Sequence, residues 1–265
     1  MNDVADRALA PRQPLQLQRM PGWKFVPLLV LALAWEAVSL SGALPSGALP
    51  PLHLVVRRTI ELFTSGDILP HLARSVERAS VGFSGAVVVG VAIGTAMARS
   101  ALVEALIKPI LSLTNPVPKP AFYPLFLIWL GAGTWSDTAV IFTGCIIPVI
   151  ISTFNGARRI NPNVIWMAKN LGMKGSRLIR KIVIPAALPE VLLGIRIALT
   201  LSWVMLVSAE MLAGQDGLGF LIGFIGEAGD YEGMFAVVLL IAVIGYATDR
   251  LFVRLMDRWL APYRG

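Results

Sequence analysis

The sequence has few charged residues, one cysteine and two histidines. Asp, Glu, Lys and Arg make up 15% of its 265 residues, whereas apolar residues make up 56%. A soluble domain is typically about 25% charged, so these charges are too few to cover a water-exposed surface of this size. Because Cys145 stands alone, an intramolecular disulfide is excluded. The composition therefore predicts an integral membrane protein embedded in a lipid bilayer.

Motifs for catalysis and for metal binding are missing as well. The sequence has no Gly-x4-Gly-Lys-Ser/Thr phosphate-binding loop, because Lys174-Gly175 has the wrong order. His53 and His71 lie outside the apolar runs without a cluster of Cys or carboxylates, so we expect no metal site. No Ser/His/Asp or paired-carboxylate arrangement suggests catalysis. We expect a chain that is not an enzyme and binds no cofactor itself.

Six transmembrane helices are expected from the apolar runs, which makes the fold class all-α. Residues 25–44 form a 20-residue run interrupted only by Glu36, long enough to cross a bilayer core as an N-terminal transmembrane helix. A cleaved signal peptide is the alternative for this run, but Glu36 and the length argue against it. The other runs are 80–97, 101–133, 138–154, 188–211 and 232–248.

Two of these runs carry distinctive small residues or prolines. Four small residues recur at every fourth position and form one helical stripe, which lets two helices approach closely in lipid; they are Gly82, Ala86, Gly90 and Gly94. The segment Asn115-Pro116-Val117-Pro118-Lys119-Pro120 must break the helix of the third run. We expect this broken run either to line a pathway or to form a packing kink.

The charges between the runs predict the orientation. Residues 155–187 contain seven Lys or Arg and no acid, whereas residues 209–232 contain five acids and no base. The positive-inside rule puts the first segment in the cytoplasm and the second outside, and it explains the net charge of +7 without a nucleic-acid partner. Both termini are then cytoplasmic, with tails over 1–24 and 251–265 and an external interfacial segment over 45–68. Four outer bases run against this rule: Arg57, Arg58, Arg74 and Arg78.

The basic segment 155–187 has the signals of an ordered helix. Asn161-Pro162 is a good N-cap followed by proline at the first helical position. Gly172 fits a left-handed stop just past the helix end, and a second short helix is expected to run to Ile184 before Pro185. One apolar stripe lies between these signals: Val164, Met167, Ala168 and Leu171. Such a helix can rest on the membrane surface or enter a groove of a partner protein.

The end of this segment resembles a loop of a known family. Gly172, nine further residues and Ile182-Val183-Ile184-Pro185 match the Glu-Ala-Ala loop of binding-protein-dependent permeases of ATP-binding-cassette importers. That loop reads Glu-Ala-Ala, three residues, Gly, nine residues and Ile-x-Leu-Pro. This chain has Trp166-Met167-Ala168 in the first position. Three further segments resemble the branch that handles nitrate, sulfonates and taurine: 115–131, 194–199 and 209–222.

The resemblance implies a type I importer permease core of five helices over residues 69–250, preceded by one N-terminal helix, in the cell inner membrane. The chain would be the permease subunit that forms the path for a small solute, such as a sulfonate or nitrate anion. It would work with an ATPase dimer that carries ATP and Mg, a second permease copy in a homodimer, and an extracytoplasmic substrate-binding protein. The coupling contacts to the ATPase would be made by Trp166, Met167, Ala168, Gly172, Ile182, Ile184 and Pro185.

An intramembrane arginine lies in the fifth run. Arg196, Thr200 and Trp203 share one helical stripe, which could line the translocation path and face an anion. The alternative is that Arg196, about 9 Å along the helix from Glu190, extends its stem to the inner interface.

Other functions stay open on the residues alone. A secondary transporter or channel without an ATPase would use the broken third run and Arg196 equally well. An intramembrane enzyme would need catalytic groups that are missing, and a membrane scaffold would not need the spacing from Gly172 to Pro185. The discriminating features are the ordered cytoplasmic loop and a bound ATPase.

Overall fold

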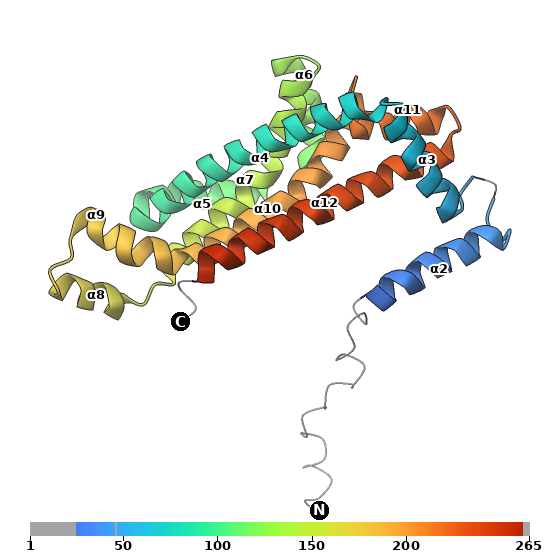
Figure 1. Ribbon diagram of the computed structural model, residues 1–265. Helices are drawn as coiled ribbons and strands as arrows, with labels where there is room; N and C mark the ends of the chain where they lie inside the picture. Colours follow the sequence, from blue (N-terminus) through green and yellow to red (C-terminus); the bar gives the residue numbers. More distant parts are fainter. Residues whose placement is uncertain (1–24, 46, 262–265) are drawn as a thin grey trace, which may run out of the picture. The chain divides into compact units, whose positions relative to one another are not determined.

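The computed structural model describes residues 25–45 and 47–261, and within these ranges it contains helices but no strand. The tail predicted over 1–24 and residues 262–265 lie outside the described part. The chain contacts define two units, residues 1–57 and 58–265. In chain order, Figure 1 shows α2 (Val26–Leu40), α3 (Leu52–Thr64), α4 (Ile68–Arg99), α5 (Ala101–Thr114), η3 (Lys119–Phe122), α6 (Tyr123–Leu130), α7 (Thr134–Arg158), α8 (Pro162–Asn170), α9 (Gly175–Leu178), η4 (Ile179–Val183), α10 (Ile184–Ala213), α11 (Leu218–Glu227) and α12 (Tyr231–Leu260).

The first unit contains α2, which falls in the predicted run 25–44. This helix has 15 residues, or roughly 22 Å at the usual rise, whereas a bilayer core is about 30 Å thick. Its transmembrane role stays a prediction. Glu36, the single charge in the run, is paired within this unit. Its Oε2 accepts a hydrogen bond from the backbone N–H of Leu52 at 2.7 Å, and its Oε1 contacts Nδ1 of His53.

The second unit is built on four helices that are long and apolar enough to cross a bilayer: α4, α7, α10 and α12. They have 32, 25, 30 and 30 residues, and they contain the predicted runs 80–97, 138–154, 188–211 and 232–248. Each helix extends beyond its run, because hydrogen-bonded backbone continues through the polar residues at the ends. The first part of the predicted tail 251–265 is therefore helix, since α12 reaches Leu260.

The stripe of small residues on α4 packs directly against α7, as predicted. A Cβ added at Gly82 would lie 2.9 Å from the side chain of Ile141, and one at Gly90 would lie 2.8 Å from Val149. Both distances are too short for a real contact, so these backbones are closer than any larger residue permits. The same core includes fully buried residues of α7 and α10: Cys145, Ala198 and Leu206.

The third predicted run is broken, as expected. It consists of α5, η3 and α6, which have 14, 4 and 8 residues. Pro116 and Pro118 have no backbone N–H to continue the helix. The Lys119 ammonium group binds the freed carbonyls at the end of α5, those of Thr114, Asn115 and Val117. None of these pieces alone is long enough to cross the bilayer, so the count of six transmembrane helices also stays a prediction.

Two elements differ from the expectations. The segment 209–232, expected only as an outer loop, contains α11. The second helix of the basic segment does not end at Ile184, because α9 and the π-helical η4 lead directly into α10. Pro185 lies in the first turn of α10, directly after the π-helical turn, where its fixed φ is compatible with helical backbone.

Candidate functional site

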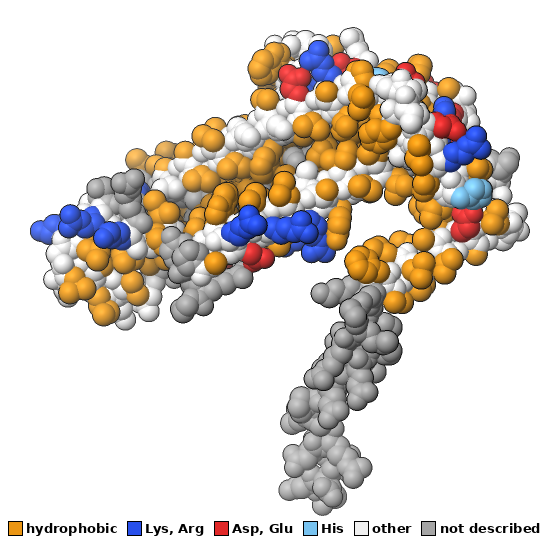
Figure 2. All heavy atoms as spheres, viewed as in Figure 1, with side chains coloured by type: hydrophobic (Ala, Val, Ile, Leu, Met, Phe, Trp, Pro, Cys, Tyr) orange, Lys and Arg blue, Asp and Glu red, His pale blue; other side chains and the backbone are white. Residues whose placement is uncertain are grey.

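The helices α8 and α9 lie at one end of the four long helices, and α11 lies at the other end (Figure 1). Figure 2 shows Lys and Arg side chains at the α8–α9 end and along the C-terminal part of α12, Lys and Arg mixed with Asp and Glu at the opposite end, and hydrophobic side chains over the flanks between the ends. This distribution is typical of a membrane protein with a basic cytoplasmic side. The polar sites of the second unit are thus found at both ends and inside the helix bundle.

Helix α8 is closed at both ends by its own residues. Asn161 accepts a hydrogen bond from the N–H of Asn163 at 2.9 Å, as an N-cap does. Gly172 has φ of +81°, the left-handed conformation expected from the sequence. The N–H of Met173 bonds the carbonyl of Ala168 at 3.0 Å, and the N–H of Gly172 bonds that of Lys169 at 2.9 Å. This pair of bonds is the Schellman motif, which stabilises the helix stop.

Large apolar side chains of α8 and its end are exposed. Trp166 is 69% exposed, Met167 65% and Leu171 78%, whereas Ala168 is buried. Further along, Ile184 is 51% exposed, and Ile182 and Pro185 are half-buried. Exposed apolar side chains on a short capped helix are suited to enter a groove of a partner protein.

The base of the basic segment is attached to the membrane helices. Arg158 donates a hydrogen bond to Glu104 of α5 at 2.8 Å, and Arg159 forms an ion pair with Glu190 of α10. A Cβ at Gly156 would lie 2.9 Å from the Cβ of Glu190, so α7 and α10 are in close contact here. The end of α7, directly before α8, therefore contacts both α5 and α10.

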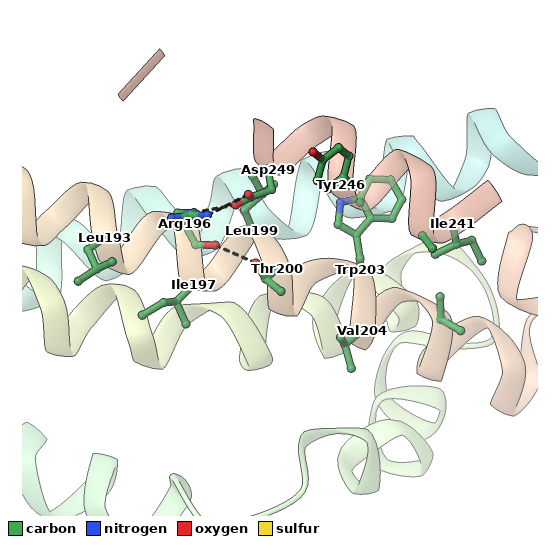
Figure 3. Close-up of a pocket in the computed structure, with 13 residues that line it drawn as sticks. Leu193, Arg196, Ile197, Leu199, Thr200, Trp203, Val204, Ile241, Tyr246 and Asp249 are labelled. Carbon is green, nitrogen blue, oxygen red and sulfur yellow. Dashed lines mark hydrogen bonds and ion pairs between the residues drawn. The ribbon is translucent and has the colours of Figure 1, made fainter. Parts of the chain in front are cut away.

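Arg196 faces a groove between α10 and α12 with a volume of about 660 Å³. Figure 3 shows its guanidinium group pointing at Asp249 of α12. The two groups form a bidentate pair, with Nε 2.7 Å from Oδ1 and Nη2 2.9 Å from Oδ2. Thr200 and Trp203 line the same groove, so the structure brings together the three predicted path residues. Glu190, on the same helix as Arg196, pairs with Arg159, and both the path and the inner-interface position of Arg196 stay predictions.

A buried ion cluster lies at the α11 end, and the sequence analysis missed it. Arg78 is 2% exposed, Asp137 is fully buried and Glu210 is 1% exposed. Arg78 Nη1 donates to Glu210 at 3.0 Å, and its Nη2 donates to Asp216. Its Nε lies 3.2 Å from Asp137 Oδ2, a close ion pair without hydrogen-bond geometry. Tyr123 donates its hydroxyl hydrogen to the other oxygen of Asp137 at 2.8 Å. One cation is thus surrounded by three carboxylates from α7, α10 and the loop after α10.

The cluster also closes the N-terminus of α11, which has no side-chain cap of its own. The first N–H groups of a helix have no partner within the helix. Here Gly219 N–H donates to Glu210 and Leu218 N–H donates to Ser75, each at 2.8 Å. Gly217 N–H donates to His71 at 3.0 Å, and Gly217 itself has φ of +105°. Side chains of α4 and α10 therefore determine where α11 begins.

A second ion pair on the same side joins α3 to the start of α12. Arg58 donates to Asp230 Oδ2 through Nε at 3.1 Å and through Nη2 at 2.8 Å. The hydrogen bond with Asp230, followed by that with Glu61, raises the pKa of Arg58 above its ordinary value. Asp230 also accepts a hydrogen bond from Gly233 N–H at 2.8 Å and so caps α12. Within the described part of the chain, no group of three or more His, Cys, Asp or Glu residues is arranged to hold a metal ion.

Comparison with known proteins gives a consistent result. Residues 86–261 match the family described as "Binding-protein-dependent transport system inner membrane component". The chain is 34% identical to SsuC of Bacillus subtilis (strain 168), named as a permease protein for aliphatic sulfonates, over 92% of this chain and 88% of that protein. It is 32% identical to the taurine transport system permease protein TauC of Escherichia coli (strain K12), over 90% and 88%. Its fold is similar to that of a chain in the inward-facing MetNI methionine ABC transporter, with a TM-score of 0.61 and 16% identity over 72% of this chain and 95% of that one.

Proposed function

The chain belongs to the family of binding-protein-dependent transport system inner membrane components, and from this premise we propose that it carries a sulfonate-type organic anion. As a member of this family it is the permease subunit of an ATP-driven importer and a multi-pass inner membrane protein, not an enzyme. Its partners are an ATP-binding-cassette ATPase and a substrate-binding protein.

The names of the relatives support an anionic solute, since SsuC is named for aliphatic sulfonates and TauC for taurine. A sulfonate group carries one negative charge and three acceptor oxygens at neutral pH. Its passage requires cations or hydrogen-bond donors inside the bilayer region, where an uncompensated charge is costly. Nitrate shares the charge and the acceptor oxygens and is the second candidate solute.

The coupling to the ATPase is proposed to use α8. The observation that carries this proposal is a short helix, capped at both ends, that exposes Trp166, Met167 and Leu171 at the basic end of the chain. A groove on the ATPase would bury these side chains, while Ala168 faces the chain itself. Gly172, Ile182, Ile184 and Pro185 would transmit the motion of α8 to α10. ATP and Mg would be bound by the ATPase partner, and this chain would bind no cofactor.

The assembly is proposed to contain two copies of this chain, with both termini in the cytoplasm. The seven bases of residues 155–187 support this orientation.

The groove lined by Arg196, Thr200 and Trp203 is proposed as one wall of the translocation path. Because Asp249 neutralises Arg196, this wall would offer polar contacts without a net positive charge.

The solute class is tested with two molecules of nearly equal shape. Methanesulfonate is an anion, and dimethyl sulfone replaces its charged oxygen by a methyl group. The permease, its ATPase and its binding protein are reconstituted in proteoliposomes, and the uptake of each labelled molecule is measured. We expect ATP-dependent uptake of methanesulfonate and none of dimethyl sulfone. Import of the neutral molecule without import of methanesulfonate, taurine or nitrate would contradict the proposed solute class.

A further inference from the structure

A cavity of about 390 Å³ lies between the broken third run and the helices α7 and α10. The break contributes Asn115, Val117 and Lys119, α7 contributes Ser152, and α10 contributes Leu201 and Met205. Small-molecule sites have volumes of roughly 300–1,000 Å³, with mostly apolar walls and a few polar groups. The size and the lining of this cavity both fit that description. None of the sites described above uses it.

The cavity lies at the mid-height of the bundle. On α7 its lining residues fall between Gly144 and Ser152, and the helix runs from Thr134 to Arg158. On α10 they fall between Ile197 and Met205, and the helix runs from Ile184 to Ala213. Both stretches include the centre of their helix. Discontinuous helices with polar groups at this depth are where transporters bind their solutes.

Lys119 differs from the other buried or half-buried cations of the membrane helices. Arg78 and Arg196 are each paired with carboxylates. The Lys119 ammonium group donates to the carbonyls of Thr114, Asn115 and Val117, the last at 2.8 Å, and no carboxylate of the described chain pairs with it. The carbonyls at a helix C-terminus offset roughly half an elementary charge. A positive charge therefore remains at the wall of the cavity.

We propose that this cavity is an anion-binding station on the translocation path. The Lys119 ammonium group and the Asn115 amide bind the oxyanion group of the solute, and the apolar side chains of α10 contact its organic part. The three donors of the ammonium group bond the carbonyls of Thr114, Asn115 and Val117. Because the stem is flexible, the donor on Val117 can turn to the solute while the bonds to Thr114 and Asn115 are kept. The proposal rests on the proposed function, because it requires an anionic solute.

The test uses three variants in the reconstituted complex. Lys119→Gln removes the charge but keeps an amide donor for the carbonyls of α5, whereas Lys119→Arg keeps the charge. Lys108→Gln is the matched control, since Lys108 lies on the same broken run, is 67% exposed and pairs with Glu104. Methanesulfonate uptake and ATP hydrolysis are measured together, with saturating loaded binding protein. The quantity compared is uptake per ATP hydrolysed.

We expect Lys119→Gln to lower uptake per ATP about tenfold or more, as the loss of a charge-assisted hydrogen bond does. Lys119→Arg should remain within about threefold of the wild type, because its charge and donors persist, and Lys108→Gln should not change. If uptake per ATP hydrolysed is unchanged in Lys119→Gln, the proposal that Lys119 binds the solute in this cavity is wrong. A parallel fall of uptake and ATP hydrolysis would also contradict the proposed anion-binding role, because a lysine that only stabilises the end of α5 would affect both rates. If the wild type imports dimethyl sulfone but no anion, the proposed solute class fails instead, and the station with it.

Discussion

At the residue scale, the buried ion cluster accounts for an arginine that runs against the positive-inside rule on the side predicted to be outside. Arg78 is surrounded by Asp137, Glu210 and Asp216, so it adds no net positive charge to that side. The rule is applied to charges in loops, and Arg78 lies inside α4. The sequence could not reveal this pairing, because the partners are far away in the chain and meet only through helix packing.

The cluster predicts a large difference between two arginines that are one turn apart on α4. Arg78→Met should lower the free energy of unfolding by about 3–5 kcal/mol, because it leaves buried carboxylates without their cation. Arg74→Met should change it by less than about 1 kcal/mol, since Arg74 is 55% exposed and its pair with Glu77 is solvated. Thermal unfolding of the purified variants in one detergent measures both. Equal effects would show that the cluster does not stabilise the fold.

Arg196 shows a similar limit of sequence analysis. The sequence left two roles open for Arg196, facing an anion path or extending its stem to the inner interface, and neither included a partner on another helix. The observed partner is Asp249, which lies 53 residues later on α12. The register between α10 and α12 determines this pair, and no local pattern in the sequence contains it.

At the element scale, local signals predicted α8 and its ends well. Asn161, Pro162 and Gly172 act within a few residues of the helix, so their spacing is sufficient. The helix α11 was missed because its N-terminus is bound by Glu210, Ser75 and His71 from other helices. The continuous path from α9 into α10 was missed because Pro185 was read as a stop, although a proline is equally suited to a first turn.

The C-terminal end of α8 at Gly172 predicts that a substitution there uncouples the permease from its ATPase. A β-branched side chain at φ of +81° costs roughly 1 kcal/mol or more, so Gly172→Val should displace α8 from the ATPase. Asparagine tolerates the left-handed conformation, so Gly172→Asn should keep the coupling. No atom lies within 4 Å of an added Cβ, so the effect is one of backbone conformation. The coupling is measured as ATP hydrolysis by the complex with and without loaded binding protein. If loaded binding protein stimulates hydrolysis fully in Gly172→Val, the loop does not have the proposed coupling role.

The contact between α4 and α7 predicts a contrast between two glycines of α4. A Cβ at Gly90 would lie 2.8 Å from Val149, so Gly90→Ala should destabilise the bundle by about 1–3 kcal/mol. A Cβ at Gly85 would lie 3.5 Å from Phe142, an ordinary contact, so Gly85→Ala should be neutral or stabilise by up to about 1 kcal/mol. Unfolding in detergent distinguishes them. If the free energy of unfolding of Gly90→Ala equals that of the wild type, α4 and α7 pack less closely than described.

At the scale of the whole molecule, the composition was sufficient to predict a membrane protein, and the residue spacing in one loop was sufficient to predict the family. The apolar runs located the four long helices, because a membrane helix needs only length and hydrophobicity. The broken third run was recognised from its prolines. Its cavity with α7 and α10 was not, since it depends on three segments that meet only in the folded chain.

The charge distribution predicts a topology with both termini in the cytoplasm. Reporter fusions after Gly133, at the start of α7, and after Gly265 test the two sides of the membrane. The first should report an extracytoplasmic position, and the second a cytoplasmic one, since residues 155–187 carry seven bases. The opposite pattern in both fusions would reverse the assignment of α8 to the ATPase side.

The most direct test of the account is the energy source of transport. The permease is reconstituted with its loaded binding protein and either an active ATPase or one that binds but does not hydrolyse ATP. A permease subunit of an importer should accumulate methanesulfonate only with the active ATPase and ATP. Uptake that proceeds equally without hydrolysis, and follows an ion or solute gradient instead, would identify a secondary transporter or channel and contradict the account.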